Sequence, residues 1–252
     1  MSEVLRSVAF SVSVVALLLP GFPARAADKR PPRPAAVTPA PSQSHTASTV
    51  FARGETLSYT ALLNEFPAGD AEIRLRKEQQ DGREVYRVTA QARTNELIDY
   101  LYRLRGTAEG MFTVNGLTPV LFHVAYTDND RPRELEVRYD AKTKTLQGSA
   151  KRKDRVTVRS VPATDVYDPS TALYLFRNTE LTPGKPFQVE VFTGKERYRI
   201  TAQVIRKENV QLTSGPRPAL RLHLMIFSLD AAPQNLNLLR ARRPSLDIHD
   251  RC

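Results

Sequence analysis

The chain has 252 residues, a formal net charge of +10 and a single cysteine, Cys252, at its last position. One cysteine excludes internal disulfides, so a hydrophobic core must hold the fold, and the terminal thiol is expected to be a solvated tail residue rather than a dimerising one. The positive charge favours anionic surroundings, such as lipid headgroups or other envelope polymers.

The first 26 residues have the layout of a signal peptide. Arg6 precedes an apolar stretch over 7–22, and Ala24 and Ala26 form a small-x-small site, which predicts cleavage after Ala26. The alternative, an uncleaved anchor helix, is weakened because Pro20 breaks the apolar run. Without the two arginines and one glutamate of the leader, the net charge is +9. We therefore expect an exported, periplasmic protein with no later transmembrane span, for which nucleic acid is not an expected partner.

Three further regions follow the leader. Residues 27–50 are rich in Pro, Ala, Ser and Thr, which predicts a disordered linker biased toward polyproline II. Residues 51–230 are long enough for one domain with a core of its own. Residues 231–252 show no alternation and carry many charges, so we expect an atypical, poorly ordered tail.

Apolar and polar side chains alternate along most of the predicted domain, which indicates half-buried strands. The period of two occurs over 57–63, 71–75, 86–92, 135–139, 187–191, 198–204 and 220–226. Tight-turn sequences such as Asp81-Gly82 and Asn115-Gly116 connect these runs. The pattern predicts a mainly β fold, an antiparallel meander that curls into a barrel or half-barrel.

Two stretches depart from this alternation and predict short helices. Over 95–104, apolar side chains fall at helical spacing after Thr94, a candidate cap. Over 169–178, Asp168 is a good N-cap and Pro169 suits the first helical position.

The second helix start also invites a catalytic interpretation, with Ser170 as nucleophile or Asp168 as acid. A nucleophilic serine needs a base within about 3 Å, and the candidate bases are His123 and His223, both inside strand-like runs. No Gly-x-Ser-x-Gly elbow surrounds Ser170. A capped helix is therefore the favoured interpretation, and a hydrolase using Ser170 with a histidine is kept as an alternative.

No metal or cofactor site is expected. The four histidines are widely separated and none forms a His-x-x-x-His pair: His45, His123, His223 and His249. A single cysteine cannot build a thiolate site.

Two sets of residues are candidates for binding. Aromatic side chains that could line the concave face of a curled sheet are Tyr59, Tyr86, Phe112, Phe122, Tyr139, Tyr174, Phe187 and Tyr198. The alternative for each of these is that it fills the core. A basic run that could contact an anionic surface comprises Lys151, Arg152, Lys153 and Arg155, and its alternative is a solvated hairpin.

Five short segments, in this order, carry a resemblance to a known family: "GETLSY" (54–59), "FPAGDAEIRL" (66–75), "GREVYRV" (82–88), "DPSTALYLFRN" (168–178) and "LTPGKPFQVEVFTGKERYRI" (181–200). Together they resemble a bacterial exported family catalogued as domain of unknown function 3108. The resemblance implies a periplasmic protein with an antiparallel, β-rich fold, and it brings no established activity. Members usually continue past the position of Asn237 with strand-like sequence, whereas this chain continues with many charges.

These observations support three hypotheses. The first is noncatalytic binding of an apolar or amphipathic component of the cell envelope, such as a lipid. The second is an envelope interaction or structural module without a small ligand. The third is the hydrolase described above.

Overall fold

The computed structural model describes residues 51, 54–63, 66–212 and 215–230. The predicted signal peptide (1–26), linker (27–50) and tail (231–252) lie outside the described residues. In the part of the chain that the structure describes, no helix has both the length and the apolar character needed to cross a membrane.

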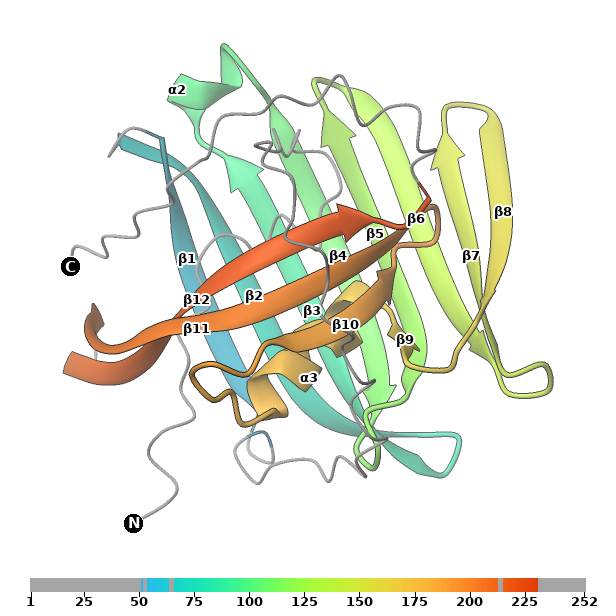
Figure 1. Cartoon of the computed structure of the whole chain (residues 1–252). Coiled ribbons are helices and arrows are strands. Elements are labelled where there is room, and N and C mark those ends of the chain that lie inside the picture. The colour runs from blue at the N-terminus through green and yellow to red at the C-terminus, as the bar shows by residue number, and fades with distance from the viewer. Residues whose placement is uncertain (1–50, 52–53, 64–65, 213–214, 231–252) are drawn as a thin grey trace.

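Eight strands form one antiparallel sheet in which each strand pairs with its neighbours in sequence (Figure 1). They are β1 (Glu55–Leu63), β2 (Phe66–Gln80), β3 (Arg83–Thr94), β4 (Leu104–Thr113), β5 (Pro119–Asp128), β6 (Arg131–Asp140), β7 (Thr145–Arg152) and β8 (Arg155–Pro162). Among the described strands, the edges β1 and β8 do not pair with each other. The predicted antiparallel meander is confirmed, as a curled sheet that stays open.

Alternation along each strand gives this large sheet two different faces. On β3, Tyr86 and Val88 are buried, while Arg87 between them lies on the other face. Strand pairing extends this division, because Tyr86 lies opposite the buried Phe112 of β4. Arg87 instead pairs with Glu109 on the outer face. The inner face therefore carries the core, and the outer face carries ion pairs.

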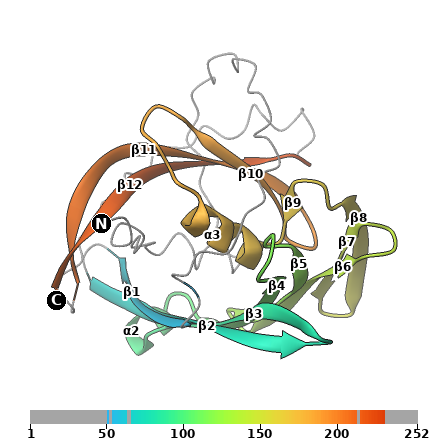
Figure 2. The same ribbon diagram turned by 90° about the horizontal axis from the view of Figure 1, so that it is seen from below.

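A second, four-stranded sheet lies across the inner face of the first (Figure 2). Its order is β12-β11-β10-β9, with β9 (Val166–Tyr167), β10 (Phe187–Phe192), β11 (Arg197–Leu212) and β12 (Gly215–Ser228). β9 and β10 pair in parallel, a geometry that requires a crossover connection, and the other pairs are antiparallel. The edge strand β12 contains Pro216 and Pro218, which have no backbone N–H.

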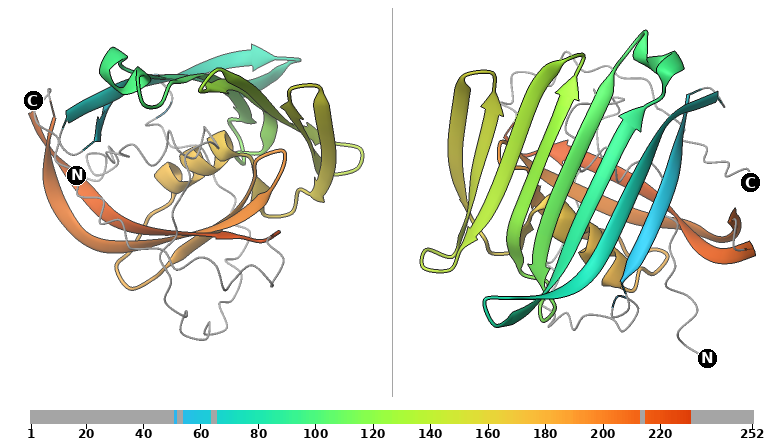
Figure 3. Two further views of the ribbon diagram at one scale, coloured as in Figure 1. Left: turned by 90° about the horizontal axis from the view of Figure 1, so that it is seen from above. Right: turned by 180° about the vertical axis from the view of Figure 1, so that it is seen from behind.

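The crossover between β9 and β10 contains the helix α3 (Pro169–Asn178), which lies between the two sheets (Figure 3). All of its residues from Pro169 to Arg177 are buried. The predicted helix over 169–178 is confirmed with these bounds, and Asp168 is its N-cap. Gly110 of β4 allows the close approach, because a Cβ at that position would overlap the side chain of Ser170.

The other predicted helix, over 95–104, is shorter than expected. α2 spans only Glu96–Asp99, and its N-cap is Asn95 rather than Thr94. The prediction was wrong at its C-terminal end because Leu104 already pairs with Asp128 as the first residue of β4. A ladder partner elsewhere in the chain outweighed the local helical spacing.

On one side, the turn between β10 and β11 joins the two sheets. Gly194 in this turn has a φ of +92° and lies so close to β6 that a Cβ would clash with the carbonyl oxygen of Glu136. Arg159 of β8 completes the seam by donating to both carboxylate oxygens of Asp230, at 2.6 and 2.8 Å. The β8 side of the molecule is therefore tied to the end of β12.

Candidate functional site

The start of α3 is a buried cap. The Asp168 carboxylate is fully buried and accepts hydrogen bonds from the backbone amides and the hydroxyls of Ser170 and Thr171. Desolvation raises the pKa of Asp168, and the four donors oppose that shift. Both hydroxyls are thus committed to holding the helix terminus.

The histidines do not complete a catalytic pair with Ser170. Ser170 contacts the inner face of the large sheet, whereas His123 follows the inward-facing Phe122 on β5 and so lies on the outer face. There, His123 Nε2 lies 3.0 Å from Glu134 Oε1. His223 is exposed on β12. Of the two histidines that the structure describes, neither faces Ser170, so the geometry needed for a hydrolase is not formed by them.

The aromatic candidates fall into two groups. Four are almost fully buried in the core: Tyr86, Phe112, Phe122 and Tyr174. The other four are half-buried: Tyr59, Tyr139, Phe187 and Tyr198. Tyr86, Phe112 and Tyr174 pack ring against ring, with the Tyr174 and Phe112 centroids 5.4 Å apart, and Phe122 belongs to the same core cluster. These four side chains therefore fill the core.

A buried ion pair ties the end of α3 to β1. The Arg177 side chain is 4% exposed, and its Nη2 donates to Glu55 Oε2 at 2.8 Å. The Tyr174 hydroxyl donates to Glu55 Oε1 at 3.0 Å, and the guanidinium lies 5.3 Å from the ring centre of Phe51. Burial raises the pKa of the nearby Tyr59 to about 12. Because Glu55 engages the guanidinium, this cluster fixes the helix rather than presenting a free charge.

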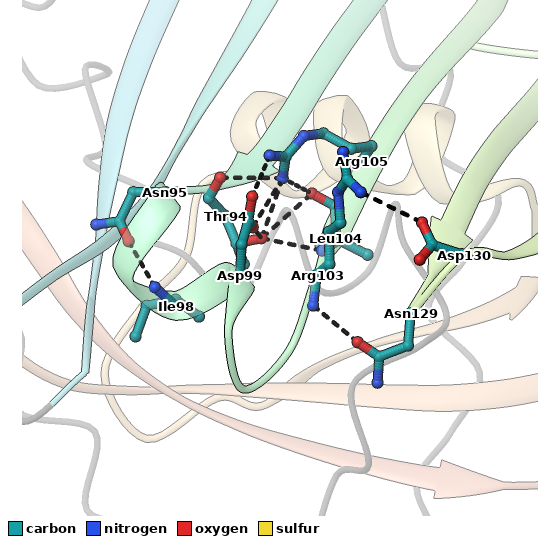
Figure 4. A network of polar contacts seen from close by, with 9 residues as sticks. All are labelled: Thr94, Asn95, Ile98, Asp99, Arg103, Leu104, Arg105, Asn129 and Asp130. Carbon is teal, nitrogen blue, oxygen red and sulfur yellow. Dashed lines mark hydrogen bonds and ion pairs between the residues drawn. The ribbon is translucent and has the colours of Figure 1, made fainter.

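A polar network holds α2 at one end of the large sheet, which we call the α2 end (Figure 4). The Asn95 side chain accepts from the Ile98 amide at 3.0 Å and donates to the Pro67 carbonyl at 2.5 Å. Asp99 accepts from Arg105 and from the Thr94 hydroxyl. The hydrogen bond from Arg105 holds the pKa of Asp99 below its usual value.

The segment that follows α2 is fixed in the same way. The Arg103 amide donates to the Asn129 side chain at 2.8 Å, and the Asn129 amide donates back to the Arg103 carbonyl at 2.9 Å (Figure 4). Arg103 also reaches Asp130, with Nη1 3.5 Å from Oδ1. The turn that carries α2 is therefore anchored on both sides, to β2 and to the β5–β6 turn.

Large apolar side chains are exposed where this network holds the chain. Leu97, Tyr100 and Leu101 are 67%, 90% and 80% exposed, respectively. The β1–β2 hairpin adds three more exposed side chains and is joined to α2 by the hydrogen bond from Asn95. We call this set the apolar rim: Leu62, Leu63, Phe66, Leu97, Tyr100 and Leu101. Such a cluster at one place on a protein surface commonly marks an interaction site.

Behind the apolar rim, the inner face of the large sheet carries small side chains. Ala71 of β2 lies opposite Ala92 of β3, which in turn lies opposite Gly106 of β4. All three are half-buried, unlike the fully buried core around α3. In Figure 1 the α2 ends of these strands extend beyond β12. The α2 end thus combines an exposed apolar rim with a face of small, half-buried residues.

Comparison with known proteins identifies the family. A family model described as protein of unknown function, DUF3108, matches residues 56–228. The chain belongs to the DUF3108 family. No curated protein and no solved structure gives a significant match. The DUF3108 match contains α3, every residue of the apolar rim and both sheets apart from Glu55, the first residue of β1.

The basic candidates also lie within the DUF3108 match, on the hairpin between β7 and β8. Lys151 and Arg152 end β7, Lys153 lies in the turn and Arg155 begins β8. All four side chains are exposed. In the described part of the chain, no ion pair engages any of them.

Sequence reasoning missed the apolar rim. Leu97 and Leu101 fall at helical spacing in the sequence, and apolar residues with that spacing usually face a core. In the described structure they face solvent, since the helix ends at Asp99 and lies at the tip of the sheet. Over the described residues, no three metal-ligating side chains gather into a site.

Proposed function

We propose that this protein binds an apolar or amphipathic molecule, without catalysis, at the α2 end of the large sheet. The observation that carries the proposal is the apolar rim, whose six large side chains are exposed while a hydrogen-bonded network fixes the backbone beneath them. Because the backbone that carries α2 is already fixed, binding does not have to order this segment.

The inner face behind the apolar rim supports the same proposal. An apolar chain that contacts Leu97 and Leu101 could continue toward Ala71 and Ala92, which are half-buried and carry small apolar side chains. The fully buried aromatic residues around α3 have no such role, because they already contact one another. Tyr59, half-buried on the inner side of β1, is the aromatic candidate placed to extend this surface.

The proposal also takes the chain to be exported to the periplasm, so that its ligand would be a component of the cell envelope. The supporting feature is the signal-peptide layout of residues 1–26. N-terminal sequencing of the protein from a periplasmic extract tests this, and the expected first residue is Ala27. An N-terminus at Met1 in the cytosolic fraction would contradict it.

Binding of the neutral apolar dye Nile red tests the site. The test variant is the double substitution Leu97→Ser and Leu101→Ser, and the matched control is Ile205→Ser on β11, where the side chain is 56% exposed. Burial of one leucine is worth about 1.5–3 kcal/mol, so we expect the test variant to weaken binding by at least about tenfold. The control should bind as the wild type does.

Native mass spectrometry of protein from a periplasmic extract provides the second measurement. A copurifying lipid-like molecule that is lost in the leucine variant is the expected result. Equal dye binding by the wild type and the leucine variant would overturn the proposal. A copurifying protein in place of a lipid would favour the alternative, an envelope interaction module without a small ligand.

A further inference from the structure

The connectivity of the meander places the apolar rim and the basic residues at one end of the large sheet. In an antiparallel meander alternate turns lie at the same end, so the β1–β2, β3–β4, β5–β6 and β7–β8 connections share the α2 end. Figure 1 shows α2 and the β7–β8 turn at the upper end of the sheet. Two chemically different surfaces therefore face the same way.

The β7–β8 turn forms what we call the basic hairpin, Lys151–Arg155. It holds four cationic side chains and one anionic side chain, Asp154, and so has a net charge of +3. Elsewhere on the sheet, arginines such as Arg87, Arg105 and Arg159 are neutralised by acids. The basic hairpin keeps its charge exposed, because no described acid pairs with its cations.

Apolar side chains accompany these cations. Val156 and Val158 follow directly on β8 and are 57% and 75% exposed. Being two residues apart on a strand, they lie on the same face of the sheet. The basic hairpin therefore joins positive charge to apolar surface, as the interfacial elements of membrane-binding proteins do.

The distance between the two surfaces indicates the kind of partner. The β3–β4 and β7–β8 connections are four strand spacings apart, which is about 19 Å at about 4.8 Å per strand. One small ligand does not span that distance while contacting both surfaces. An extended partner with a negatively charged surface and an apolar interior can contact both surfaces at once.

We propose that the α2 end docks on an anionic phospholipid bilayer, with the apolar rim in the interfacial region and the basic hairpin on the headgroups. Tyr100, the most exposed side chain of the rim, has the amphipathic ring that is favoured at membrane interfaces. This inference rests on the proposed function for the role of the rim and adds the identity of the partner and the second contact.

Cosedimentation with vesicles tests the inference in the full-length mature protein. The vesicles are either pure phosphatidylcholine or a mixture of phosphatidylcholine and phosphatidylglycerol, each at low and high salt. The hairpin variant combines Lys151→Gln, Arg152→Gln and Lys153→Gln. The control combines Arg83→Gln, Lys142→Gln and Lys144→Gln, three exposed cations at the β2–β3 and β6–β7 turns of the opposite end.

The hairpin variant should bind the anionic vesicles about a hundredfold more weakly at low salt, because each cation near such a surface contributes about fivefold. Its binding to neutral vesicles and to Nile red should not change, and high salt should remove the difference from the wild type. The control variant should bind both kinds of vesicle as the wild type does.

The outcomes separate this inference from the proposed function. If the hairpin variant binds anionic vesicles like the wild type, the inference is overturned, while loss of Nile red binding by the Leu97→Ser and Leu101→Ser variant still supports the proposed function. If that leucine variant keeps full binding to both dye and vesicles, both are overturned. If the control variant loses as much binding to anionic vesicles as the hairpin variant does, the attraction is due to overall charge and the docking surface is refuted.

Discussion

The contact between α3 and the large sheet can be tested by adding a methyl group on one side of it, at Gly110 of β4, and removing the side chain of Ser170 on the other side. In the structure, a Cβ added at Gly110 would overlap both Cβ and Oγ of Ser170. Rotation of the Ser170 side chain cannot relieve the overlap, because its Cβ is also involved. Ser170 is 1% exposed and bonded to Asp168, so Gly110→Ala must push α3 away from β4.

The expected cost follows from this geometry. Overpacking of a core costs about 1–3 kcal/mol. Because the overlap involves two atoms of Ser170, which its hydrogen bonds hold in place, we expect a cost at the upper end of that range. Replacing a strand glycine returns about 0.5–1 kcal/mol. We therefore expect Gly110→Ala to lower the free energy of unfolding by about 2–2.5 kcal/mol, which corresponds to a fall in Tm of about 4–10 °C.

A double variant makes the prediction specific. Ser170→Gly alone should cost about 2 kcal/mol through the lost hydroxyl hydrogen bond and the flexible glycine in the first turn. Combined with Gly110→Ala, it vacates the space that the new methyl group needs. Urea unfolding of the four proteins should show the double variant at least about 1.5 kcal/mol more stable than the sum of the single changes implies. Additive effects, or a neutral Gly110→Ala, would refute the reasoning.

The remaining predictions concern three carboxylates. The pKa of Asp168 is raised in the folded state, so its contribution to stability is present below the unfolded pKa and is lost as pH rises through the folded pKa. The stability of Asp168→Asn relative to the wild type should therefore increase as pH rises, as measured by unfolding between pH 4 and 7. The pKa of Asp99 is lowered through Arg105, so its contribution is present above the unfolded pKa and lost as pH falls; the advantage of the wild type over Asp99→Asn should vanish in acid, and an advantage that persisted there would be the contrary result. Glu55→Ala leaves Arg177 buried without its partner and should cost about 3–5 kcal/mol in thermal unfolding. Glu55→Leu with Arg177→Met also removes the charge and should cost only about 1–3 kcal/mol, because the Tyr174 hydroxyl still loses its acceptor. Equal losses in the two would speak against a buried pair.

Local patterns in the sequence predicted local structure well. The start of α3 followed from Asp168 and Pro169, because capping depends on neighbours within one turn. The alternation from Tyr86 to Ala92 predicted a strand with one buried face, since that face is set by the pleat of the strand itself.

Features that depend on distant residues were not predicted. The extent of α2 was overestimated because Leu104 joins a ladder with Asp128, far along the chain. The division into two sheets was not predicted either, because β10 pairs in parallel with β9 and not with β8, and no local pattern indicates that choice. Exposure of Leu97 likewise depends on where the end of the large sheet lies, so the apolar rim emerged only in three dimensions.

The two prolines of β12 bear on self-association. A free edge strand is a template on which a second copy can add a strand, and proteins blunt such edges with proline. Pro216 and Pro218 remove two amide donors from the part of β12 that pairs with the last residues of β11. Intermolecular strand addition along that part is therefore blocked, and copies of this protein that joined through β12 would have to use the stretch from Ala219 to Ser228.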